Sequence, residues 1–138
     1  MYVAITKPKT KTKTNTSKKN NKDNDNKNHN VYVLKDTEAS PQVIEYVGRT
    51  VDLQRTEYRH SQNAARSHLK LQVVARNVDR NTARGLEQMY IIRCKTLKKG
   101  FPTNNQINGV SEKNLIKHPE FWNAATEWVD ENNHLSPC

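Results

Sequence analysis

The sequence predicts an α+β fold in which a small three-stranded antiparallel sheet is flanked by helices. Three short runs with strand character occur at residues 31–34, 43–48 and 69–76. Longer stretches that begin with helix-start residues follow the second and third runs, as expected when helices pack on a small sheet. A chain of 138 residues has room for one domain of this kind.

The first two runs predict a β-hairpin. "VYVL" at 31–34 and "VIEYVG" at 43–48 are rich in β-branched and aromatic residues, and a polar segment with Pro41 separates them. A loop of about six residues is short enough to require antiparallel strands. The third run, "LKLQVVAR" at 69–76, alternates apolar and polar positions and predicts the third strand.

Helices are expected after the hairpin and after the third strand. Asp52 is a suitable N-cap for a helix from residue 53 to about 68. Asp79 can cap a second helix from about 80 to 98, and Gly100 favours its end. Two short helices are expected beyond them, at residues 111–118 and at residues 119–133, which open with a proline.

Most of the positive charge lies at the start of the chain. Residues 1–30 contain eight lysines and two aspartates, a net charge of +6 from a total of +9. This segment has no apolar residue after Ile5, so burial cannot offset the entropy cost of ordering it. We therefore expect residues 1–30 to be a disordered linker and residues 31–138 to form the domain. Its charge would attract any polyanion, and a merely solubilising role explains it equally well.

The cysteines and the hydropathy of the chain argue against a disulfide framework, a signal peptide and a membrane span. Cys94 lies in an apolar helical stripe and Cys138 is far from it in sequence, so we expect both thiols to be free and Cys94 to be a small core residue. The apolar start "MYVAI" is too short for a signal peptide, and no apolar run approaches membrane-spanning length. We expect a soluble chain with no membrane span and no export signal of its own.

Glu87 differs from the other carboxylates because the predicted helix places it in an apolar stripe. Ala83, Glu87, either Tyr90 or Ile91, and Cys94 share one helical face. A carboxylate on an apolar face must find a cation or hydrogen-bond donors, or its pKa must shift. A neighbouring arginine or a divalent metal ion would satisfy it, and the residues alone leave both open.

Polar residues suited to phosphodiester cleavage gather around the second predicted strand. Tyr32 and Tyr46 can lie side by side across the hairpin, and Gly48 allows another group to approach closely. The next helix carries three more candidates, Arg55, Arg59 and His60. Together with a carboxylate, such groups can activate water and stabilise charge on a phosphorane-like transition state.

These positions resemble the motif that gives the GIY-YIG nuclease superfamily its name. The likeness extends from residue 31 to about residue 110 and rests on five short segments. They are "VYV" at 31–33, "YVG" at 46–48, "RT" at 49–50, "LEQ" at 86–88 and "NNQING" at 104–109. The resemblance implies a three-stranded α+β domain that hydrolyses nucleic acid phosphodiester bonds with a single Mg²⁺ or Mn²⁺ ion.

By motif position, the resemblance also implies roles for individual residues. Tyr32 and Tyr46 match the two family tyrosines, one of which helps to activate the attacking water, and His60 matches a frequent histidine on the first helix. Glu87 matches the carboxylate that binds the metal ion. The supporting residues would be Gly48, Arg49 and a later asparagine, either Asn105 or Asn108.

The chain departs from the family pattern in three ways. Val31 replaces the glycine of the first tripeptide, which is a tolerable change. The family's catalytic arginine falls at Thr56 here, so Arg55 or Arg59, which point about 40° apart on a helix, would have to replace it. Of the two we prefer Arg55. Third, we expect no additional DNA-binding domain, and therefore no site selection by a separate module.

The layout of one such domain behind a low-complexity segment also resembles the C-terminal toxin module of bacterial polymorphic or contact-dependent delivery systems. That resemblance implies an exported carrier, action in the target-cell cytoplasm and a cognate immunity protein as partner, while the compartment of the chain as given stays unknown. Two alternatives to a nuclease remain: a catalytically degenerate module that only binds nucleic acid, and a protein-interaction domain. DNA and RNA are equally good substrates on this reading.

Overall fold

The structure, a computed structural model, describes residues 26–138. We expected a linker at residues 1–30, and residues 1–25 of it lie outside the described residues. The elements follow one another as β1 (His29–Asp36), β2 (Val43–Thr50), α2 (Leu53–Ser61), β3 (Lys70–Val78), α3 (Arg80–Cys94), α4 (Glu112–Lys117) and α5 (Glu120–Asn132). The predicted α+β class with a small antiparallel sheet is confirmed.

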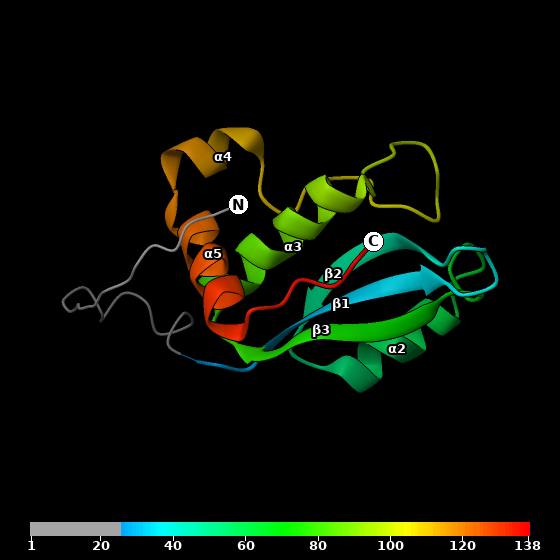
Figure 1. Ribbon diagram of the computed structural model, residues 1–138. Helices are drawn as coiled ribbons and strands as arrows, with labels where there is room; N and C mark the ends of the chain where they lie inside the picture. Colours follow the sequence, from blue (N-terminus) through cyan, green and yellow to red (C-terminus); the bar gives the residue numbers. More distant parts are fainter. Residues whose placement is uncertain (1–25) are drawn as a thin grey trace.

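The sheet has the order β2-β1-β3, and both pairings are antiparallel (Figure 1). The predicted β1–β2 hairpin is present, with residues 37–42 as its loop. β1 begins at His29, two residues before the predicted start at Val31, because the buried Asn30 side chain bonds to both neighbouring strands. Its Nδ2 donates to the carbonyl of Thr50 (3.2 Å), and its Oδ1 accepts from the amide of Asn77 (3.1 Å).

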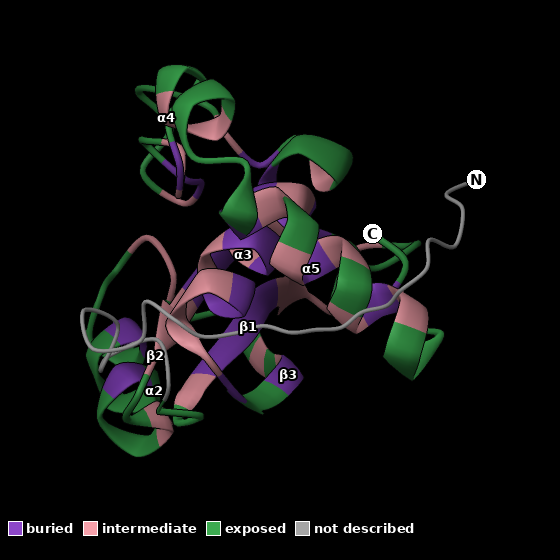
Figure 2. Ribbon diagram, turned by 90° about the vertical axis from the view of Figure 1, so that its left-hand side faces the viewer, coloured by how far each residue is buried: buried purple, intermediate pink, exposed green. Residues whose placement is uncertain are grey.

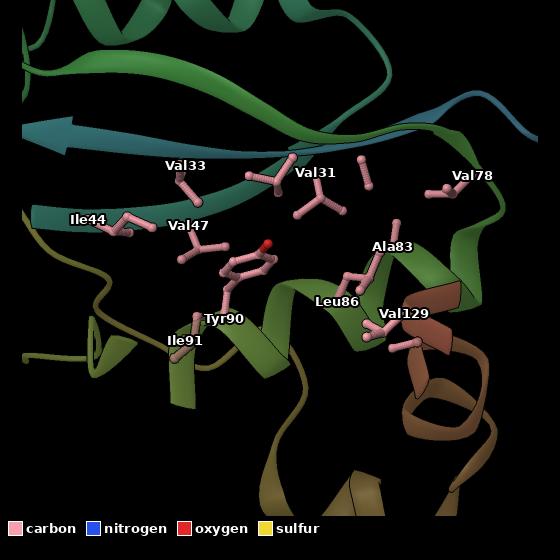
Figure 3. Close-up of a cluster of buried hydrophobic side chains, with 13 residues drawn as sticks. Val31, Val33, Ile44, Val47, Val78, Ala83, Leu86, Tyr90, Ile91 and Val129 are labelled. Atoms are coloured by element: carbon pink, nitrogen blue, oxygen red, sulfur yellow. The ribbon is translucent and has the colours of Figure 1, made fainter. Parts of the chain in front are cut away.

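Helices cover the two faces of the sheet unequally (Figure 1). α3 packs across one face with α5 behind it, and α2 lies on the opposite face. The core between the sheet and α3 is drawn in Figure 3. It consists of Val31, Val33, Ile44, Val47, Val74, Ala75, Val78, Ala83, Leu86, Tyr90, Ile91, Ala125 and Val129.

The alternation of β1 supplies a second, smaller cluster on the α2 side. Val31 and Val33 point to α3, so Tyr32 and Leu34 point the other way, since successive side chains of a strand face opposite sides. Tyr32 and Leu34 are buried there with Leu69. β1 is buried along most of its length, as the purple strand in Figure 2 shows. Both faces of this central strand therefore contribute side chains to a hydrophobic cluster.

α2 is shorter than predicted. Asp52 caps it as expected, accepting from the amide of Arg55 at 3.0 Å. The helix ends at Ser61 and not near residue 68, because Asn63 forms a local turn in which its Oδ1 accepts from the amide of Ala65 (2.8 Å). Asparagine side chains compete with helical hydrogen bonds in this way.

α3 begins as predicted and ends earlier. Asp79 accepts from the amide of Thr82 at 2.7 Å, which confirms the N-cap. The helix stops at Cys94 because Lys95 adopts a left-handed conformation with φ of 53°, which turns the chain toward the loop that follows. α4 and α5 confirm the two short helices. No helix within residues 26–138 is long and apolar enough to cross a membrane.

The cysteines are not free, contrary to the expectation from the sequence. Cys94 and Cys138 form a disulfide bond, with their Cα atoms 5.3 Å apart. After α5 the chain returns along the end of α3, where the amide of Ser136 donates to the hydroxyl of Tyr90 (2.7 Å) and the amide of Ile44 donates to the carbonyl of Cys138 (3.1 Å). Sequence spacing gave no sign of this return, because it depends on where α5 directs the chain.

Candidate active site

A cluster of three aromatic rings, two buried and one partly buried, lies on the α2 side of the sheet. Tyr32 from β1, Tyr46 from β2 and His60 from α2 have ring centroids between 5.2 and 6.4 Å apart. The hydroxyl of Tyr32, which is 2% exposed, forms a hydrogen bond with Nε2 of His60 at 2.8 Å. The structure therefore brings together the two tyrosines and the histidine that the sequence singled out.

Gly48 permits this arrangement because it lies directly opposite Tyr32 in the β1–β2 pairing. A Cβ atom at Gly48 would overlap the hydroxyl of Tyr32, and the ring carbons behind it would be 2.5 to 2.8 Å away. The phenol ring of Tyr32 thus lies against the backbone of β2 at Gly48, and its hydroxyl bonds to His60. The close approach expected at Gly48 is made by the tyrosine itself.

Burial fixes the protonation of this pair. Desolvation, with the positive charges of Arg66 and Arg59, lowers the pKa of His60 to about 4. Burial, with the neighbouring Tyr46, raises the pKa of Tyr32 above its ordinary value. At neutral pH Tyr32 is therefore a phenol and His60 an uncharged imidazole, which has one N–H donor and one acceptor nitrogen.

Glu87 lies on α3, where Arg49 of β2 pairs with it. The Nε of Arg49 donates to Oε1 of Glu87 at 3.0 Å, and the Glu87 side chain is 13% exposed. Burial raises the pKa of Glu87, while the charges of Arg49 and Arg84 oppose that shift. Of the two readings left open by the sequence, the arginine partner is present. No hydrogen bond within the described residues reaches the second oxygen, Oε2.

A pocket of about 280 Å³ at the outer edge of β2 connects Tyr46 with the Arg49–Glu87 pair, whereas Tyr32 and His60 do not line it. Tyr46 faces the α2 side and Arg49 the α3 side, so the pocket reaches both faces around the edge strand. Gly109 closes it against Glu87, since a Cβ there would lie 2.7 Å from Oε1. The lining residues are Tyr46, Arg49, Arg66, Glu87, Asn105, Gln106, Ile107, Asn108 and Gly109.

Arg66 is a site residue that the sequence reasoning missed. Its guanidinium lies 4.1 Å from the centre of the Tyr46 ring, and its Nε and Nη2 donate to the carbonyls of Thr103 (3.3 Å) and Asn104 (3.2 Å). We expected residue 66 inside a helix, where its direction would have been different. The signal that could have located it is Asn63, a turn former that ends α2 early.

The three positions considered for the catalytic arginine separate clearly. Thr56, at the family's position, is buried, and its hydroxyl donates to that of Thr50 at 2.7 Å. Arg55 is exposed and lines none of this pocket. Arg59 is also exposed, but its charge acts on both Tyr32 and His60. Arg59 does not line the pocket either, whereas Arg66 does, so the geometry favours Arg66 over the preferred Arg55.

Both predicted asparagines line the pocket, but they differ in availability. Asn105 is buried and pairs like a strand residue with Val47, accepting from its amide (2.9 Å) and donating to its carbonyl (2.8 Å). Its Oδ1 also accepts from Thr96 (2.7 Å), so its amide holds the loop to β2. Asn108 accepts from Gln88 at 2.9 Å and is half-buried.

The donor set suits one hard divalent cation held loosely by the protein. Within residues 26–138 no three His, Cys, Asp or Glu side chains come together as a ligand cage. Mg²⁺ commonly uses one or two carboxylates and completes its shell with water and substrate phosphate oxygens. Oε2 of Glu87, partly exposed and without a hydrogen bond among the described residues, can supply such a ligand. The residues present therefore fit a single Mg²⁺ or Mn²⁺ ion.

Comparisons of this chain with protein-family models, with curated proteins and with solved structures found no match. A functional assignment therefore rests on the pocket, where a carboxylate, two guanidiniums, a phenol and amide groups line one small volume.

Proposed function

We propose that this domain is a metal-dependent nuclease that hydrolyses phosphodiester bonds in nucleic acid, as its resemblance to the GIY-YIG superfamily implies. One observation carries the proposal. The carboxylate of Glu87, the phenol of Tyr46 and the guanidiniums of Arg49 and Arg66 line the same pocket, although they come from three separate segments of the chain: β2, the turn after α2, and α3.

The two arginines provide the attraction for a phosphodiester. Arg49 and Arg66 place positive charge on opposite sides of the pocket lining, and guanidinium groups bind phosphate oxygens through charge-assisted hydrogen bonds. Tertiary contacts already orient both side chains: Arg49 donates to Glu87, and Arg66 donates to two loop carbonyls. Such preorganised cations stabilise the charge that grows on phosphate oxygens in the transition state.

The aromatic cluster would position the water that attacks the phosphate. Tyr46 lines the pocket, so its hydroxyl can hold the attacking water, whereas Tyr32 is buried and holds His60 in place. His60 is uncharged at neutral pH and does not line the pocket, so it would act through its hydrogen bond with Tyr32 and not on the phosphate directly. A metal ion bound at Glu87 would supply stabilisation of the leaving oxygen.

The test is cleavage of supercoiled plasmid DNA and of total RNA by the purified chain, with Mg²⁺ or Mn²⁺ and with EDTA. We expect Glu87→Gln to reduce cleavage about 100-fold or more, because it removes the metal-binding oxygen charge. Glu131→Gln, the same change at an exposed position of α5, is the matched control and should cleave normally. Intact substrates with the wild type and metal, or normal cleavage by Glu87→Gln, would contradict the proposal.

A second candidate is a module that binds nucleic acid without cleaving it. The Arg49–Glu87 ion pair favours it, because the arginine neutralises the carboxylate that a metal ion would need. This candidate predicts strongly salt-dependent binding and no product in any metal, since phosphate contacts dominate such binding. The cleavage assay separates the two candidates directly.

We also propose that the nuclease acts as a toxin module in a target-cell cytoplasm and is restrained by a cognate immunity protein. This setting is supported by the resemblance of the layout alone. Induced expression in a bacterial cytoplasm should stop growth for the wild type and for Glu131→Gln, but not for Glu87→Gln. Degradation of either chromosomal DNA or total RNA in the arrested cells would identify the substrate. Normal growth with soluble wild-type protein would contradict the toxin role.

A further inference from the structure

Arg84 of α3 is a half-buried cation that does not line the pocket. Its Nε is buried and has no hydrogen-bond partner, the one such side-chain atom among the described residues. Its guanidinium lies 4.6 Å from the centre of the Phe121 ring on α5. A stacked guanidinium keeps its rim N–H groups pointing outward, so Arg84 is held in a fixed orientation with donors to spare.

The surroundings of Arg84 are mostly positive. Burial, followed by the charges of Arg49 and Arg80, lowers the pKa of Arg84, and only Glu87 acts in the opposite direction. The first turn of α3 contains no acidic residue, although the positive end of the helix dipole lies there. The carboxylate of Asp79 is used by the helix cap. Of the charges that act on Arg84, only that of Glu87 is negative, and Glu87 is already paired with Arg49.

The position of these cations relates them to the pocket. Arg84 precedes Glu87 by three residues on α3, so their Cβ atoms are about 5–6 Å apart on one side of the helix. Arg80 lies one further turn toward the helix start. Arg49 acts electrostatically on Arg84 and donates to Glu87, and it therefore belongs to both groups. Arg84 and Arg80 themselves do not line the pocket.

We propose that Arg84 and Arg80 form a phosphate subsite that holds a neighbouring phosphate of the nucleic acid strand beside the pocket. The identity of this ligand rests on the proposed function. Arg84 offers a stacked, oriented fork of donors, and the start of α3 adds a favourable field for an anion. The strand would then run from the pocket past Arg49 toward Arg84 and Arg80.

Binding without catalysis tests the subsite. Fluorescence anisotropy of a short labelled single-stranded DNA in EDTA measures affinity while metal-dependent cleavage is absent. Arg84→Met keeps an unbranched apolar side chain beside Phe121 and removes the donors, and Arg80→Met removes the second cation. Each should raise the Kd about 5- to 20-fold and lower the slope of log K against log salt by about 0.7, the value for one lost phosphate contact on a single strand.

Arg76→Met is the matched control, because Arg76 is an exposed arginine on β3 and its loss changes net charge equally. Its affinity should stay near that of the wild type. Arg84→Lys, which keeps the charge without the fork, should recover part of the lost affinity and remains informative if Arg84→Met unfolds. Wild-type binding by Arg84→Met, or an equal loss in Arg76→Met, would overturn the subsite.

The failure of the subsite and the failure of the nuclease are distinguishable. If Glu87→Gln and the wild type bind equally but neither cleaves, the nuclease proposal fails while the Arg84 comparison still decides the subsite. If the wild type cleaves and Arg84→Met binds normally in EDTA, the nuclease stands and the subsite is wrong.

Discussion

Gly48 decides whether Tyr32 can reach His60. Replacement by alanine forces the phenol of Tyr32 away, because the new Cβ would overlap its hydroxyl. We expect Gly48→Ala to lower the free energy of unfolding by about 1–3 kcal/mol, as overpacking of a close-packed region does, and to reduce cleavage. Urea denaturation and the plasmid assay measure the two effects.

A double-mutant cycle identifies the cause. In a Tyr32→Ala background the ring is gone, so adding Gly48→Ala should cost much less stability than it does in the wild type. Equal costs in the two backgrounds would show that Gly48 is needed for its backbone conformation and not for the passage of Tyr32.

His60 makes stability depend on pH in a defined window. Its pKa is lowered to about 4 in the folded protein from an ordinary value of 6.5. Between these values the unfolded chain binds the proton more readily, so the folded state loses stability as pH falls from about 6.5 to about 4. His60→Gln should lack this loss, as measured by urea denaturation at several pH values.

Glu87 contributes with the opposite sign, because a raised carboxyl pKa favours the folded state at low pH. Subtracting the free energy of unfolding of His60→Gln from that of the wild type at each pH removes the contribution of Glu87, since both proteins contain it. Parallel stability curves for the two proteins across the window would contradict the assignment of an uncharged, buried His60.

Much of the candidate site was predictable because its residues lie on regular elements. Strand alternation places Tyr32 and Tyr46 on one face, and helical spacing places Glu87 in an apolar stripe that needs a cation. Arg66 was not predictable in the same way. It lies in an irregular turn after α2, and its direction depends on hydrogen bonds to residues 103 and 104, far away in sequence.

Local sequence was sufficient to predict that the strands exist and where the helices begin, but it was not sufficient to predict where the helices end. Asp52 and Asp79 cap their helices through contacts three residues away, so local sequence was sufficient. α3 ends where Lys95 turns left-handed and Thr96 bonds to Asn105, a tertiary contact with a distant loop. Local propensity favoured several more helical residues there.

The disulfide ties α3 to the returning chain and should add measurable stability. Its cysteines are separated by 44 residues in sequence. Closing a loop of that size stabilises the folded state by about 4 kcal/mol in the chain-entropy description. We expect a reducing agent to shift the urea midpoint of the wild type downward by a corresponding amount.

The Cys94→Ala and Cys138→Ala double variant is the control. It should already have the lower midpoint and should not respond to the reducing agent. A wild-type curve that is the same with and without reductant would show that the bond does not stabilise the fold in solution.

At the scale of the whole molecule, charge is divided between the first segment and the domain. Residues 1–28 carry +6 of the total +9. Deleting them should weaken DNA binding by the Glu87→Gln variant about 10-fold at low salt and much less at high salt, because screening removes the long-range attraction. Anisotropy titrations across salt concentrations measure this.

Cleavage by the deleted chain at saturating DNA should be unchanged, since every residue of the pocket lies in the remaining domain. Equal low-salt affinities with and without residues 1–28 would mean that the segment serves solubility and not substrate attraction.

The hydrogen bonds along β2 have a consequence for how the protein behaves in concentrated solution. β2 is an edge strand, and exposed strand edges invite pairing with other chains and aggregation. Here Cys138 bonds to the amide of Ile44, Asn104 to the carbonyl of Glu45 and Asn105 to both groups of Val47. The loop and the returning chain thus act as a surrogate fourth strand, which leaves this edge little backbone for edge-to-edge association.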